Sequence, residues 1–243
     1  MSSSELIYQT YRESCLSFCQ EYNLPYGMSA VSVIFLILSN ICFIPAAAIV
    51  FGYREYLTGI VLTCSYVQSV FYHMCLGGFF CFVELPVLMI LDVYWSTLSI
   101  VAISLYLVGH GYVSCEMREE EISRQGAMTV YLVICSNVIL IMTMVLSHNT
   151  ILVAVTAFVL AVIPLVVVWG VVDGTHGFVS RYRWKFIPPA LIFAAISFVF
   201  YYLGSNSDYA IYHSLWHLCI SLSVLFIVLA KKEHPQRYAD KFR

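Results

Sequence analysis

Residues 209–230 read YAIYHSLWHLCISLSVLFIVLA, a run that contains no Asp, Glu, Lys or Arg. A helix needs about 20 apolar residues to cross the hydrocarbon core of a bilayer, and this run is long enough. It nevertheless carries two histidines, His213 and His217, that are four positions apart. Four residues make about one helical turn, so both imidazoles project from one face. The stretch therefore predicts a membrane-spanning helix with a pair of ionisable side chains.

The rest of the chain has the same apolar character. Of its 243 residues, 61% are hydrophobic and only 11% are charged, which excludes an ordinary soluble domain. The apolar runs are long and continuous, whereas a membrane barrel would show short alternating segments. We therefore predict an all-α membrane protein, a bundle of seven transmembrane helices. The predicted spans lie near residues 28–51, 57–76, 83–108, 127–147, 150–170, 187–204 and 209–230.

The basic residues predict the orientation of this bundle. With seven spans, the connections and tail on one side contain only Arg12, and those on the other side contain the remaining eleven Lys and Arg residues. Cytoplasmic segments carry the excess of Lys and Arg, so we expect an exterior or luminal N-terminus and a cytosolic C-terminus. The predicted regions are a short exterior tail (1–27), the transmembrane domain (28–230) and a basic cytosolic tail (231–243). No cleavable signal peptide is evident in the first of these.

Polar residues recur at one depth of the predicted bundle. Ser69 and His73 lie one turn apart near the outer end of the second span, and Asp92 lies in the outer part of the third. His213 and His217 lie about 6 and 12 Å below the outer start of the seventh span, at about 1.5 Å per residue. Ionisable groups at membrane depth are costly and mark functional sites. Their common depth predicts one shared site.

The types of these residues indicate a zinc site. Neutral imidazole is a favoured ligand of Zn²⁺, and catalytic zinc typically has three protein ligands. We expect His73, His213 and His217 to be these ligands. Asp92 is the expected general base or the residue that orients a ligand, and Ser69 is expected to hydrogen-bond water, Asp92 or a developing oxyanion.

Three other interpretations of this sequence compete with a zinc site. The histidines can form a metal-free polar cluster with Tyr72, Tyr212 and Trp216. A retinal protein needs a Schiff-base lysine in its last helix, and residues 208–230 contain none. A G-protein-coupled receptor fits the number and orientation of the spans but does not require three histidines at one depth.

The other histidines and the cysteines carry less information. We expect His110, His148, His176 and His234 to be solvated, and residues 117–121 to form a solvated loop. Cys15, Cys19, Cys75 and Cys81 lie on or near the expected oxidising side, where one or two disulfides can form. Their pairing does not follow from the sequence.

The pattern of Ser69, His73, Asp92 and His213-x-x-x-His217 resembles the signature of a superfamily that includes alkaline ceramidases, progestin/adiponectin receptors and TMEM8 proteins (the CREST superfamily). Three blocks, residues 39–45 (SNICFIP), 71–75 (FYHMC) and 209–217 (YAIYHSLWH), resemble the TMEM8 branch, which includes myomaker. In size the chain is most similar to myomaker.

This resemblance implies a membrane protein that contains a zinc site and promotes myoblast fusion. Its expected location is the plasma membrane, with the Golgi and secretory pathway as further candidates. The alternative is a zinc-dependent hydrolase of lipid amides or esters, ceramidase-like or phospholipase A2-like, including action on GPI lipids. A third alternative is a lipid or sterol receptor. Vertebrate myomaker lacks the aspartate that Asp92 represents, which favours the hydrolase. Membrane lipid is the expected partner, a homodimer and a fusion partner protein are further candidates, and no nucleic acid is expected.

Overall fold

The structure, a computed structural model, describes residues 3–21, 24–25, 27–53, 55–108, 119–146, 149–167, 182–204 and 208–231. All regular elements in these ranges are helical. They are α1 (Ser3–Glu21), α2 (Ala30–Asn40), η1 (Ile41–Phe43), α3 (Ile44–Gly52), α4 (Tyr56–Leu76), α5 (Leu85–Val108), α6 (Glu119–Val145), α7 (Thr150–Val167), η3 (Trp184–Phe186), α9 (Ile187–Gly204) and α10 (Tyr209–Ala230).

The helices agree closely with the predicted spans. Six segments are long and apolar enough to cross a membrane: Ala30–Gly52, Tyr56–Leu76, Leu85–Val108, Gly126–Val145, Trp184–Gly204 and Tyr209–Ala230. The remaining apolar helix of the described chain, Leu152–Val167, is shorter and corresponds to the predicted fifth span. The protein is therefore an all-α, multi-pass membrane protein, while the count of seven spans and their orientation stay predictions. One prediction was wrong: residues 119–121, expected in a loop, begin α6.

The first predicted span is broken in its middle by a short 3₁₀ turn, η1, between α2 and α3. The cause is Pro45, which has no N–H to donate to the carbonyl of Ile41 four residues earlier. That carbonyl instead accepts a hydrogen bond from the backbone N–H of Ile44, in the tighter 3₁₀ pattern. The break turns Phe43 toward the interior of the bundle, where it packs in a core with residues of α4, α5 and α10.

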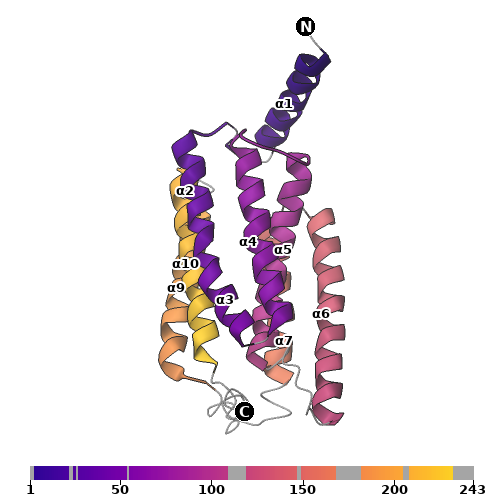
Figure 1. The fold of residues 1–243 in the computed structure, drawn as a ribbon, viewed down its shortest axis with the longest axis vertical. Helices are drawn as coiled ribbons and strands as arrows, with labels where there is room; N and C mark the ends of the chain where they lie inside the picture. The colour runs from indigo at the N-terminus through magenta and orange to yellow at the C-terminus, as the bar shows by residue number, and fades with distance from the viewer. Residues whose placement is uncertain are drawn as a thin grey trace.

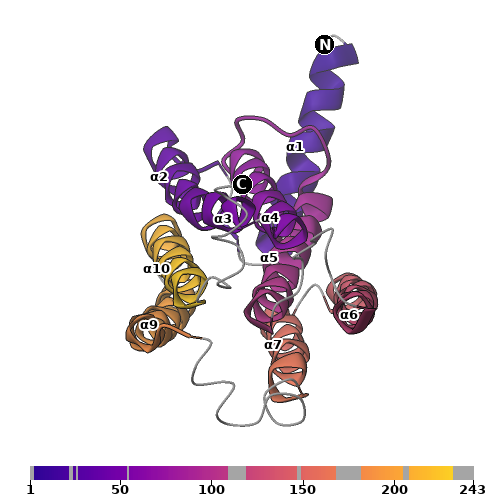
Figure 2. The same cartoon turned by 60° about the horizontal axis from the view of Figure 1, so that its bottom comes forward.

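The long helices form a bundle in which α5 contacts α4, α6, α7 and α10 (Figures 1 and 2). The last helix, α10, packs along α9 and also against α2, η1 and α3. The connection between α4 and α5 lies at the end of the bundle that carries α1, and the C-terminal end of α10 lies at the opposite end (Figure 1). The last turns of α4 and the first turns of α10 therefore lie toward the same end of the bundle.

Helix α1 was not anticipated, because residues 1–27 were assigned only to a tail. It projects from one end of the bundle (Figure 1) and presents two buried cysteines, Cys15 and Cys19, to a core formed with α4 and α5. Both thiols are free. Burial, with a smaller effect of Cys15, raises the pKa of the Cys19 thiol to about 11, so this thiol is protonated and unreactive at neutral pH.

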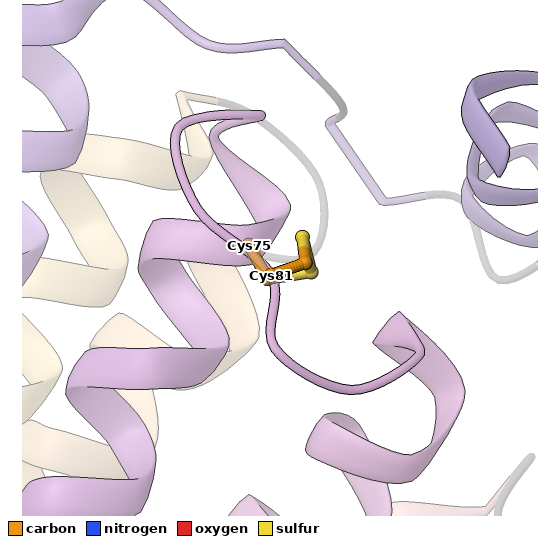
Figure 3. The surroundings of a disulfide bond; sticks show 2 residues. All are labelled: Cys75 and Cys81. Atoms are coloured by element: carbon orange, nitrogen blue, oxygen red, sulfur yellow. A yellow bond between two sulfur atoms is a disulfide. The ribbon is translucent and has the colours of Figure 1, made fainter. Parts of the chain in front are cut away.

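A disulfide joins Cys75 to Cys81. Cys75 lies in the last turn of α4 and Cys81 in the connection to α5, so the bond ties the end of α4 to the segment that follows it (Figure 3). Of the four cysteines considered for disulfides, the structure thus pairs these two and leaves Cys15 and Cys19 unpaired. The pair agrees with the expected oxidising environment at this end of the bundle.

An ion pair fixes the opposite end of the bundle. Lys231 Nζ lies 3.0 Å from Oε1 of Glu55, whose side chain is fully buried. The same ammonium group donates a hydrogen bond to the carbonyl of Tyr106 and lies 4.1 Å from the centre of its ring. The hydroxyl of Tyr106 in turn donates to the carbonyl of Val228. These contacts connect the end of α10 to α5 and to the segment that precedes α4.

We expect Lys231→Met to lower the free energy of unfolding by about 3 kcal/mol, because it leaves the Glu55 carboxylate buried without its cation. Thermal unfolding of the purified protein in detergent measures the change. Lys185→Met is the matched control, because Lys185 is exposed and lies 5.0 Å from the ring of Phe186. Adding Glu55→Gln to Lys231→Met should recover much of the loss, and equal effects of Lys231→Met and Lys185→Met would contradict the prediction.

Candidate metal centre

The three histidines predicted as ligands come together in the structure. His73 lies in the last turn of α4, and His213 and His217 lie one turn apart in the first half of α10. One ligand atom from each residue lies within 4.8 Å of the others. The ring centroid of His73 is 5.0 Å from that of His213 and 5.3 Å from that of His217. The described residues contain no other such group of three.

This cluster lies inside the protein. His73 and His217 have exposed fractions of 0% and 2%, and Nε2 of His213 is also buried. The Nε2 atoms of His73 and His217 lie 3.1 Å apart, so one ring can donate a hydrogen bond to the other. Among the described residues, however, Nδ1 of His73, Nδ1 of His217 and Nε2 of His213 have no hydrogen-bond partner.

These unpartnered nitrogens favour a metal site over a metal-free cluster. A buried polar atom without a partner costs about 1–3 kcal/mol, and native proteins rarely leave several together. Among the described residues, a metal-free arrangement offers these rings one hydrogen bond, that between His73 and His217. A metal ion would take up one lone pair from each ring, and three imidazole ligands are a common set for zinc. The residues present therefore fit a metal ion.

Aromatic rings surround the cluster. Tyr209, one turn before His213, stacks on that ring with centroids 4.6 Å apart. Trp216 contacts His213 at 4.8 Å and His217 at 4.5 Å. Phe43, from the 3₁₀ break, meets His217 edge-on at 6.5 Å. These rings restrict the orientations of the imidazoles and exclude water, which strengthens electrostatic interactions at the centre.

Asp92 and Ser69 lie beside each other but outside the set of ligands. Ser69 of α4 is 2% exposed, Asp92 of α5 is 8% exposed, and the serine hydroxyl interacts with the carboxylate. Their contact is loose, because Ser69 Oγ and Asp92 Oδ1 have no hydrogen bond of ordinary geometry to any described residue. Asp92 does not belong to the group that can hold a metal. Its position suits a group that acts beside a metal rather than on it.

Two tyrosines link Asp92 to the histidines and were missed as site residues. Tyr72 is 4% exposed and lies close enough to Asp92 for electrostatic interaction. It also shares a side-chain hydrogen bond with Tyr209, the residue that stacks on His213. The spacing of Tyr209, His213 and His217 gives one helical face, and this signal was available in the sequence. Tyr212, considered for a metal-free cluster, contacts Phe200 instead. His110, His148, His176 and His234 lie outside the described residues.

Comparisons with known proteins place this centre in a family. A sequence model of a family described as "Protein of unknown function (DUF3522)" matches residues 28–218, which include all five predicted site residues. The chain belongs to this family. The matched segment begins just before α2 and ends within α10, one residue beyond His217.

Proteins of the TMEM8 branch are similar to most of this chain. Human Transmembrane protein 8B is 27% identical over 223 residues, which cover 87% of this chain and 44% of the relative. The bovine and mouse proteins of that name are each 26% identical over 224 residues, which cover 88% of this chain and 44% of the relative. The chain spans less than half the length of these relatives. The resemblance to the TMEM8 branch is thus confirmed, whereas the finer resemblance to myomaker stays a prediction.

We expect His73→Ala and His217→Ala each to abolish stoichiometric zinc binding, because each removes one of three ligands. The loss should exceed the roughly 10–100-fold cost of removing an outer partner of a zinc ligand. Elemental analysis of the protein purified without added metal measures the zinc content. His234→Ala is the control, because it removes a histidine that the sequence assigns to the cytosolic tail. Stoichiometric zinc in both cluster variants, or none in the unmodified protein, would remove the basis of the site.

Proposed function

We propose that the protein is a zinc-dependent hydrolase embedded in the membrane, acting on an ester or amide bond of a lipid. The observation that carries this proposal is a buried carboxylate, Asp92, in loose contact with Ser69 one helical turn from His73, together with three clustered histidines that have unpartnered nitrogens. A structural zinc site almost always has four protein ligands, whereas three ligands are typical of a catalytic site. The predicted span orientation puts this centre in the outer part of the bilayer, within reach of outer-leaflet lipids.

Each residue of the centre has a distinct role in the proposed hydrolysis. His73, His213 and His217 would hold Zn²⁺, which when bound supplies Lewis-acid polarisation of water or of a carbonyl oxygen. Asp92 accepts a proton from the attacking water and returns it to the leaving group. Ser69 donates its hydroxyl to Asp92 or to oxygen charge that develops on the substrate. Tyr209 holds the ring of His213 in place by stacking, and Tyr72 holds Tyr209 by a hydrogen bond.

Hydrophobic side chains favour a lipid as the substrate. The rings that contact the cluster belong to Tyr72, Tyr209, Trp216 and Phe43, whereas Lys185 and Lys231 lie over the rings of Phe186 and Tyr106 instead. An apolar substrate can therefore approach without leaving a charge unpaired. The resemblance to ceramidases and to the longer TMEM8 proteins supports an amide or acyl ester bond, including one in a GPI lipid.

Membrane fusion is a second candidate, and one specific observation favours it. The ligands come from two helices, His73 from α4 and the other two from α10, so a metal ion here would also bridge these helices. In a myomaker-like fusion protein at the plasma membrane, that bridge would hold the bundle together, and no proton acceptor would be needed. The two functions therefore differ in what they require of Asp92.

We expect Asp92→Asn to lower lipid turnover by about 10²–10⁴-fold, the usual contribution of a general base, while zinc stays bound. Release of fatty acid from labelled ceramides and phospholipids in proteoliposomes measures turnover. Asp208→Asn is the matched control, because Asp208 is an exposed aspartate that precedes α10 and makes no capping hydrogen bond. If the unmodified protein with bound zinc turns over none of these lipids, the hydrolase proposal fails.

The fusion candidate predicts a different result for the same variant. Cells that express the protein, mixed with fusion-competent partner cells, should form syncytia, and Asp92→Asn should leave their number nearly unchanged. His217→Ala should abolish them, because the bridge between α4 and α10 is lost. Surface labelling controls for delivery to the plasma membrane. No syncytia despite surface delivery would count against fusion and leave the hydrolase proposal untouched.

A further inference from the structure

The connection between α4 and α5 differs in composition from the two other connections that the predicted topology puts on its side of the membrane. Residues 77–83 read GGFFCFV, with three phenylalanines and no charge, and are called the aromatic loop below. The other two connections, after α6 and α9, read LSHN (residues 146–149) and SNSD (residues 205–208). Those two have the polar composition usual for a segment in water. The aromatic loop does not.

The phenylalanines of the aromatic loop are exposed in the folded protein. Phe79, Phe80 and Phe82 have exposed fractions of 56%, 52% and 53%. Single exposed apolar residues are ordinary, but contiguous ones mark a surface that contacts another apolar phase. Phe80 and Phe82 stack with ring centroids 6.3 Å apart, so the rings form one patch.

The aromatic loop has a defined shape. The disulfide between Cys75 and Cys81 closes it, and Gly78 takes a φ of 77°, a conformation that favours glycine. The backbone N–H groups of Gly77 and Phe79 donate to the last carbonyls of α4, those of His73 and Met74, at 3.0 Å each. A side chain at Gly77 would collide with Val33 of α2. The exposed rings are thus held in place before any partner arrives.

The position of the loop identifies the apolar phase. Phe82 packs against Phe71 of α4, with centroids 4.8 Å apart, so the loop folds back along the flank of a membrane span. Phe71 follows Val67 by four residues, and Val67 in turn follows Ile60 by seven, which puts the three on one face of α4. Ile60 and Val67 are 50% and 40% exposed. The patch therefore continues an exposed apolar face of α4, which is long and apolar enough to span a membrane.

We propose that the aromatic loop is a lipid-binding element that inserts Phe79, Phe80 and Phe82 into the outer leaflet of the membrane in which the protein resides. Phenyl rings carry no polar group that must stay at the headgroups, so they can enter the region of the first acyl carbons. The loop caps the helix end that carries His73, so the lipids it contacts are those next to the metal centre. This proposal does not depend on the proposed function.

The experiment places single reporter tryptophans in the loop, Phe79→Trp and Phe80→Trp, in separate variants of the full chain. The proteins are reconstituted into vesicles of phosphatidylcholine with or without bromine atoms near the headgroup end of the acyl chains, because bromine quenches tryptophan emission on contact. Emission of the unmodified protein, with its four native tryptophans, is subtracted. Val145→Trp, at a 69% exposed position ending the span of α6, is the lipid-contact control. Glu21→Trp, at an exposed position of α1 outside the spans, is the aqueous control.

We expect both loop reporters to emit at shorter wavelength than Glu21→Trp and to lose emission in brominated vesicles to the extent that Val145→Trp does. Emission that matches Glu21→Trp would overturn the proposal. So would short-wavelength emission without quenching, which would mean that protein, such as a second copy of the chain, covers the loop. Quenching only by brominated lipid in separate, apposed vesicles would overturn the assignment to the host leaflet. Zinc content and an intact disulfide establish that each variant is folded.

Discussion

A polar atom inside a bilayer has no water to bind, so each one must find a partner within the protein. The interior of this bundle holds three clustered imidazoles and also a carboxylate in loose contact with a hydroxyl, and several of their polar atoms lack a hydrogen-bond partner among the described residues. The contact between α4 and α10 depends on how that deficit is met. Aromatic rings pack around the imidazoles but supply no donor or acceptor to the three unpartnered nitrogens. A cation would take one lone pair from each of the three rings, which is why the geometry favours a metal centre over a histidine cluster.

The sequence was sufficient for the features that follow from local periodicity. Apolar length predicted the helices long enough to span a membrane to within a few residues, except that α6 begins at Glu119, ahead of its predicted start at 127. The ligand set was also predictable: His213 and His217 share a face at one helical turn, and matched depth brought His73 to them. The same argument from depth predicted Asp92 and Ser69 at this level. Asp92 was expected to act beside the ligand set, and in the structure it is not part of the group that can hold a metal.

Other features depend on contacts between distant segments and were therefore not predictable. The pairing of Cys75 with Cys81, rather than with Cys15 or Cys19, depends on where α1 comes to lie on the bundle. The burial of Glu55 against Lys231 joins residues 176 positions apart, and each alone had the composition of a solvated connection. The 3₁₀ break has a local cause, the hydrogen bond that Pro45 cannot make, but it was not predicted either. Tyr209 was not predicted as a site residue because tyrosine is not a usual zinc ligand, although it occupies the same helical face.

Polar contacts lie near both ends of helix α10, with packing against α9 and α2 between them. Near its start, the ring of His217 lies within hydrogen-bonding distance of His73 of α4; at its end, Lys231 reaches Glu55 and Tyr106. Glu55 directly precedes α4, so polar contacts connect α10 to α4 near one end and to the segment before α4 at the other. A rotation of α10 about its axis would displace both contacts, since His217 and Lys231 move with the same helix. The ion pair at the far end therefore helps to keep the histidines of α10 facing His73.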